Sequence, residues 1–181
     1  MTSPTDRLLS GQWTCARCGD VHGWPYDLAA IAPGPWPHER SYAHNSMLRR
    51  DADFLSEDFC VLAEDQHFFV RALMEIPVQG LDAPFGFGCW TTLSRANFDR
   101  YVEQFDENSP PEQEPWWGWL SNGLADLSTE PLGVWVHPQP GRQRPLLTVA
   151  DEDHPLAVAQ RDGLTPEKMI DILALYGHAP E

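Results

Sequence analysis

Apolar and polar residues alternate most regularly over residues 67–93, which we predict to form a β-hairpin. Side chains of a strand point alternately to its two faces, so an apolar residue at every second position predicts one buried face. Residues 79–84 contain glycine, aspartate and proline, which predict a turn, and residues 85–93 form a return arm rich in aromatic and β-branched residues. The buried face of the first arm, residues 67–78, consists of Phe68, Val70, Ala72, Met74, Ile76 and Val78.

A second hairpin is predicted over residues 132–149. Residues 132–137 alternate as a strand, the sequence Pro-Gln-Pro-Gly at 138–141 predicts a turn, and residues 144–149 are the partner strand. The two hairpins together predict a mostly antiparallel sheet.

Helices are predicted after each hairpin. Ser94 can cap a helix over residues 95–105, and a short helix is expected between Pro155 and Gly163. Thr165 as N-cap precedes a last helix, whose core-facing stripe recurs at helical spacing. The fold class is therefore α+β, with two or three helices flanking the sheet. The stripe of the last helix is Met169, Ile172, Leu173 and Tyr176.

The remaining segments carry weaker patterns. Residues 1–12 are expected to be a flexible tail, and residues 13–181 a single α+β domain. Short helical turns are expected near residues 27–31 and 47–50. Trp116, Trp117 and Trp119 are interpreted as an aromatic core plug, with a platform for a ligand or partner as the alternative.

The charge balance limits the classes of partner. The chain has 27 acidic and 12 basic residues, a net charge of −15, and Lys168 is its one lysine. Such a surface repels phosphate groups, so neither nucleic acid nor an anionic membrane is an expected partner, whereas a basic protein is. No apolar run approaches the ~20 residues that span a bilayer, and no secretory signal is visible, so we expect a cytoplasmic protein. The sequence does not indicate an oligomeric state.

A metal site is predicted at the motif Cys15-Ala16-Arg17-Cys18-Gly19. Two cysteines in a tight turn, followed by a glycine that can adopt positive φ, are typical of zinc knuckles. His22 lies four positions further on, and Cys60 is our choice for the remaining ligand. We expect a structural zinc, because knuckles of this kind are closed by four protein ligands. Other possible ligands are Cys89 and His67.

Two alternatives to this closed site stay open. Cys15 and Cys18 could be unligated thiols in a turn. With three protein ligands, the fourth position would be open to water and the metal could be catalytic.

A different site would make the protein a small enzyme acting on an anionic substrate. If the two hairpins lie side by side, a histidine next to an arginine could perform general acid–base chemistry. Histidines that precede prolines are also typical of caps and turns, and no nucleophile elbow or phosphate loop is present. The candidate residues for this site are Arg71, His137, Arg144, Asp153 and His154.

Ten segments spread along the chain form a recognisable set: Cys15-x-x-Cys18-Gly19-x-x-His22, Asp58–Val61, Phe68–Arg71, Glu75–Pro77, Trp90–Ser94, Gly118–Leu120, Val136-His137, Arg144-Pro145, Asp153–Ala157 and Gln160-Arg161. Together they resemble an uncharacterised bacterial family, the domain of unknown function numbered twenty-one ninety-nine. The resemblance implies a single-domain bacterial protein with no assigned reaction. Ser121 and Ala159 depart from the family pattern, which makes both poor candidates for a chemical role.

These observations favour a zinc-stabilised, acidic protein-interaction module. A strongly acidic surface can steer association with a basic partner, as in immunity proteins that neutralise a toxin. The enzyme with an Arg/His site is the alternative function.

Overall fold

A computed structural model of the protein describes residues 2–40, 46–107, 114–128 and 131–181. The described helices are α1 (Pro4–Leu9), α2 (Arg95–Glu107), α3 (Pro155–Asp162) and α4 (Pro166–Leu175). The described strands are β1 (Gln12–Thr14), β2 (Val21–Gly23), β3 (Asp27–Ala29), β4 (Leu48–Arg50), β5 (Asp53–Leu55), β6 (Phe59–Leu62), β7 (His67–Ile76), β8 (Phe85–Leu93), β9 (Trp116–Leu120), β10 (Leu132–His137) and β11 (Leu146–Val149).

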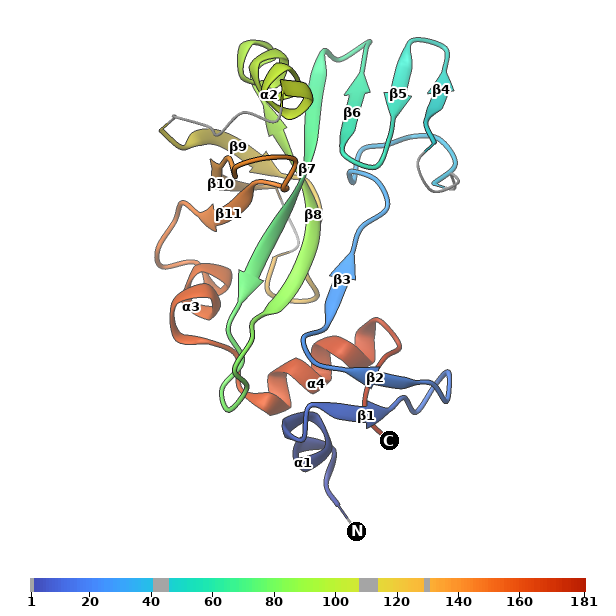
Figure 1. Ribbon diagram of the computed structural model, residues 1–181, viewed down its shortest axis with the longest axis vertical. Helices are drawn as coiled ribbons and strands as arrows, with labels where there is room; N and C mark the ends of the chain where they lie inside the picture. Colours follow the sequence, from blue (N-terminus) through green and yellow to red (C-terminus); the bar gives the residue numbers. More distant parts are fainter. Residues whose placement is uncertain (1, 41–45, 108–113, 129–130) are drawn as a thin grey trace.

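Five of the strands close into a barrel in the order β7-β8-β9-β10-β11 and back to β7 (Figure 1). Strand β9 joins the two predicted hairpins, because it pairs with both β8 and β10. The parallel pairing of Leu146 on β11 with Leu73 on β7 completes the ring. The α+β composition is as predicted. The sheet, however, is a closed barrel with extra strands, so a description as two antiparallel hairpins is insufficient.

The hairpin β7–β8 forms the longest part of the barrel. Its register runs from Phe68 opposite Leu93 to Ile76 opposite Phe85. The predicted apolar face of the first arm lies in or against the main core, and Val70, Ala72 and Met74 are fully buried there. The alternation in the sequence therefore identified the inward face of β7 correctly.

Additional strands extend the sheet on both sides of this hairpin. Strands β6, β5 and β4 follow β7 in antiparallel order, and β3 pairs in parallel with β8. The short helical turns expected near residues 27–31 and 47–50 are therefore wrong, because these residues form β3 and β4. A second apolar cluster, which includes Trp36, Cys60, Phe69 and Trp90, lies on this part of the sheet.

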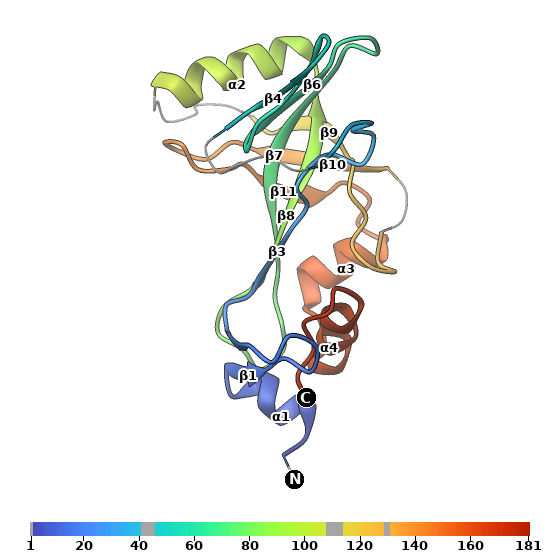
Figure 2. The same ribbon diagram turned by 90° about the vertical axis from the view of Figure 1, so that its right-hand side faces the viewer.

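Helices lie at both ends of the long hairpin, and α3 lies between them beside β7 and β11 (Figure 2). Helix α2 packs near the end with β4–β6, and Ser94 accepts a hydrogen bond from the N–H of Asn97 at its start. Helices α1 and α4 lie at the opposite end, next to β1, β2 and both chain termini. No described helix is long and apolar enough to cross a membrane.

The first twelve residues contain ordered structure, where we expected a flexible tail. Helix α1 begins with a capping box in which Ser3 and Asp6 bond each other's backbone N–H. Leu8 on this helix is fully buried and joins the main core. The helix has only six residues, which is too short for a periodic apolar pattern to identify it.

Candidate metal centre

The short hairpin β1–β2 presents the cysteine motif at its tip. Trp13 on β1 lies opposite His22 on β2, and the six residues between the strands form the connecting loop. Gly19 has φ of 75°, which allows the tight turn after Cys18. The backbone N–H of Arg17 donates to Cys15 Sγ at 3.4 Å, as expected for a loop that surrounds a thiolate.

The C-terminal segment lies along this hairpin and brings a histidine to it. After α4, Gly177 with φ of 80° turns the chain toward β1. The indole of Trp13 donates to the carbonyl of His178 at 2.9 Å, and the N–H of Ala16 donates to the carbonyl of Ala179 at 3.0 Å. The backbone around residue 178 is therefore held against the cysteine loop by hydrogen bonds.

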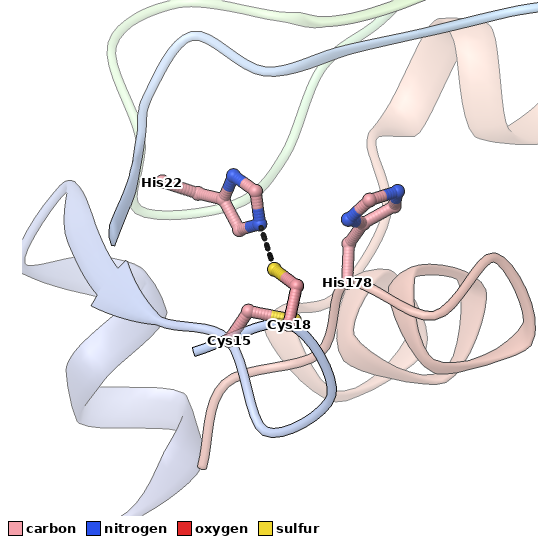
Figure 3. A group of neighbouring side chains, drawn as sticks. All are labelled: Cys15, Cys18, His22 and His178. Atoms are coloured by element: carbon pink, nitrogen blue, oxygen red, sulfur yellow. Dashed lines mark hydrogen bonds between the residues drawn. The ribbon is translucent and has the colours of Figure 1, made fainter. Parts of the chain in front are cut away.

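Cys15, Cys18, His22 and His178 form one compact group, shown in Figure 3. Their ligand atoms all lie within 4.8 Å of one another, and Cys18 Sγ is 3.7 Å from His22 Nε2. In a tetrahedral zinc site the ligand atoms are about 3.3–3.8 Å apart, given Zn–S and Zn–N bonds of about 2.0–2.3 Å. The group is therefore close to the size that a zinc ion requires.

His178 provides a separate indication that a ligand belongs here. Its Nδ1 atom is buried and has no hydrogen-bond partner among the described residues. A buried polar atom without a partner is costly, and most such atoms in proteins bond protein, water or an ion. In Figure 3 one ring nitrogen of His178 points toward the two cysteines and His22, where a metal would supply the missing partner.

The two thiols of the group differ in acidity. The backbone N–H of Cys18 is the main cause that lowers the pKa of Cys15 to about 7. The backbone N–H of Asp20 lowers the pKa of Cys18, but hydrogen bonding to Cys15, partial desolvation, the Asp20 side chain and the charge of Cys15 together raise it above its usual value. One thiol is thus close to losing its proton at neutral pH, and thiolates are the form that binds zinc.

The structure brings together three of the four residues predicted as metal ligands. Cys60 lies on β6 at the opposite end of the molecule, and the prediction that it completes the site is corrected (Figure 1). Its side chain is fully buried in the second apolar cluster, and burial raises the pKa of its thiol to about 12. Cys89, another possible ligand, is buried in the main core on β8, where desolvation raises the pKa of its thiol.

The fourth member of the group, His178, was missed by the sequence analysis. It lies 156 residues after His22, at the end of the chain, and no motif surrounds it. The one available signal is the helix pattern of residues 165–176, because it predicts that the following residues stay attached to the core. That pattern does not say which surface they reach.

Two arginines of the predicted Arg/His site share a partner. Arg144 pairs with the carboxylate of Asp58 at 2.9 Å, and the backbone N–H of Arg71 donates to the carbonyl of Asp58, also at 2.9 Å. The histidines are bonded elsewhere: His137 bonds Thr148, and Nδ1 of His154 accepts from the N–H of Leu156 as the N-cap of α3. Asp153 is exposed, and its N–H donates to Asp151.

The fold and this group define a class of protein: a closed β-barrel with added strands and helices, and a Cys/His group whose ligand atoms lie close enough to hold a metal. The family is given by a family model that matches residues 14–164, described as an uncharacterized protein conserved in bacteria (DUF2199). The chain belongs to this family, as its motifs indicated. His178 lies outside the matched residues. No curated protein and no solved structure matches the chain.

Proposed function

We propose that this protein is an acidic protein-interaction module whose N- and C-terminal segments are joined by a structural zinc. The observation that carries the zinc proposal is the group of Cys15, Cys18, His22 and His178, with ligand atoms within 4.8 Å of one another. Four protein ligands leave no open coordination position, and such sites stabilise folding rather than perform chemistry. This favours the closed site over a catalytic metal.

The zinc would add a further link between two segments that hydrogen bonds already hold together. Strands β1 and β2 have three residues each, and Trp13 is their one buried side chain. A two-stranded hairpin of this size is marginal in water. A metal held by the hairpin and by His178 would connect it to the C-terminal segment and through that to α4.

The proposed interaction role rests on charge. A net charge of −15 favours a basic partner and speeds its association at low ionic strength. Neutralisation of a basic protein by direct binding, as in immunity proteins, is the form of this role that we propose. The enzyme alternative needs a histidine next to an arginine, but the described hydrogen bonds of His137 and His154 are to Thr148 and Leu156.

Metal content tests the zinc proposal directly. Protein purified without a histidine tag is expected to contain about one zinc per chain by mass spectrometry. Cys18→Ser and His178→Gln should each lose most of the zinc, whereas Cys60→Ala, a buried cysteine outside the group, should retain it. Absence of metal in the wild type, or equal loss in Cys60→Ala, would contradict the site.

A further inference from the structure

Three tryptophans form an exposed aromatic surface on the outside of the barrel. Trp117, Trp119 and Trp135 are 45%, 49% and 42% exposed, whereas the neighbouring Trp116 points inward and is buried. The alternation along β9 separates them, so the interpretation of residues 116–120 as a core plug holds only for Trp116. We call Trp117, Trp119 and Trp135 the tryptophan surface.

The tryptophan surface is held in place by its own packing. Trp117 contacts both Trp119 and Trp135 edge to face, with ring centroids 5.8 and 5.1 Å apart. The ring of Trp117 lies against Gly133, where an added Cβ would come within 2.6 Å of the indole. Rigid aromatic side chains lose little conformational entropy when they bind, which suits them to act as anchors in interfaces.

The indole N–H groups of this surface also differ from those of four other tryptophans. The indoles of the buried Trp13, Trp36 and Trp90 and of the half-buried Trp24 donate to backbone carbonyls. Those of the tryptophan surface donate to no described residue. These indole donors therefore lack an acceptor among the described residues, and between 42% and 49% of each tryptophan is exposed.

Acidic residues follow β11, the strand that pairs with β10 at Trp135. Trp119 is paired with Gly133, whose carbonyl accepts from the N–H of Ala150 at 3.0 Å. Residues 151–153, all exposed and all acidic, follow Ala150 directly. The nearby cation Arg161 is bonded to Asp162, so the local charge stays negative.

We infer that the tryptophan surface docks an arginine-bearing segment of a basic partner protein. Guanidinium groups stack on indole faces and pair with carboxylates, and arginine does so more often than lysine. A second copy of this chain is disfavoured, because two surfaces of a −15 protein would repel. The inference rests on the proposed interaction role and adds its location and the chemistry of its partner.

Trp119 extends the surface toward an apolar groove. A cavity of about 450 Å³ lies beside it, lined also by Pro35, Phe69 and Pro131. An apolar side chain of the partner next to its arginines would fit this groove.

Nuclear magnetic resonance of the indole N–H signals tests the inference. The probe is a nonapeptide that alternates arginine and glycine, and its lysine counterpart is the comparison. Signals of Trp117, Trp119 and Trp135 should shift on titration, and those of the buried Trp13 and Trp90 should not. The arginine peptide should bind more tightly than the lysine peptide, with an affinity that falls as salt is added.

Substitutions can distinguish peptide binding by stacking on the tryptophans from binding by the negative charge of the protein as a whole. Trp117→Ala/Trp119→Ala/Trp135→Ala should weaken peptide binding about tenfold or more. Trp135→Ala alone, which leaves the contact of Trp117 with Gly133 intact, should give a smaller loss and guards against misfolding of the triple variant. Asp151→Asn/Glu152→Gln/Asp153→Asn should weaken binding more than the matched exposed control Asp51→Asn/Glu64→Gln/Asp65→Asn.

Several results would overturn the inference. These are an absence of indole shifts at millimolar peptide, equal binding of the lysine peptide, or equal loss in the control variant. Concentration-dependent dimerisation through these tryptophans by sedimentation would identify a second copy as the occupant. Shifts caused by maltohexaose and not by the arginine peptide would assign the surface to a neutral glycan. None of these binding results depends on zinc, so the metal proposal is tested separately, by metal content.

Discussion

The hairpins β1–β2 and β7–β8 have the same connectivity but are stabilised differently. Hairpin β7–β8 has nine paired positions, and one face of β7 lies in the main core. Hairpin β1–β2 has three paired positions, and Trp13 is the one buried side chain of its two strands. Apolar burial is sufficient to hold the first, because each buried side chain contributes about 1.5–3 kcal/mol. The second is too small for this, and the zinc that we propose at the Cys/His group would be another means of holding it.

Removal of metal should give the largest difference between the two hairpins, because only β1–β2 should lose its structure. Structural zinc contributes about 10–16 kcal/mol of apparent binding free energy in zinc-finger peptides. Chelation should therefore abolish hydrogen-exchange protection in residues 12–23 and 177–181, while the amides of β7 and β8 stay protected. Protection should return when zinc is added. Unchanged protection of β1 and β2 after chelation would show that the small hairpin is stable without metal.

A substitution that creates a cavity in the barrel should lower the stability of the fold and leave metal binding unchanged. Met74 is fully buried on β7, opposite Phe87, so Met74→Ala should lower the free energy of unfolding by about 2–5 kcal/mol. Zinc content should not change, because the substitution leaves the Cys/His group intact. Urea unfolding measures the first effect and mass spectrometry the second. The adjacent exposed Glu75→Ala is the control, and a comparable loss there would contradict the burial argument.

A smaller effect is expected at the one buried residue of the small hairpin. Trp13→Phe removes the indole N–H that donates to the carbonyl of His178 and should cost about 1–2 kcal/mol. Because this bond connects β1 to the C-terminal segment, the variant should also bind zinc more weakly in competition with a chelator. Trp119→Phe on the exposed surface is the control, and it should leave zinc affinity unchanged.

The difference between the hairpins also explains which features the sequence could predict. Residues 67–93 combine alternation with a clear turn, so the strands, their inward face and their pairing were all predicted. Strands β3 and β4 have three residues each, and too few positions alternate to distinguish them from a helical turn. Barrel closure depends on β9 and on the parallel contact of Leu146 with Leu73, and neither leaves a local pattern.

For the metal group, too, the sequence predicted the local part and missed the part that depends on tertiary packing. Cys15, Cys18 and His22 lie within eight residues, and their spacing alone predicted that they meet. The fourth residue is brought in by the packing of α4 and the turn at Gly177, which are tertiary features. Cys60 was chosen because cysteine is a preferred zinc ligand, but an apolar cluster surrounds it. The type of a residue was therefore a poorer guide to the fourth ligand than its position in the folded structure.

A third hairpin, β4–β5, extends the comparison to one held by a carboxylate, and here the smallest effect is expected. Asp53 accepts from the backbone N–H of Ala63 at 2.9 Å and pairs with His38 at 2.8 Å. The Ala63 bond is the main cause, and His38 the next, that keep the pKa of Asp53 below its usual range. A carboxylate with a lowered pKa stabilises the fold at pH values above its unfolded pKa of about 3.9, and this stabilisation is lost as the pH falls through the folded value.

Asp53→Asn should therefore cost about 1 kcal/mol at pH 7, and the difference from the wild type in urea unfolding should shrink below about pH 4. Asp51→Asn, in the turn of the same hairpin at a φ of 54° that asparagine tolerates, should show no such difference. A cost for Asp53→Asn that stays constant down to pH 3 would mean that the carboxylate charge does not hold this hairpin.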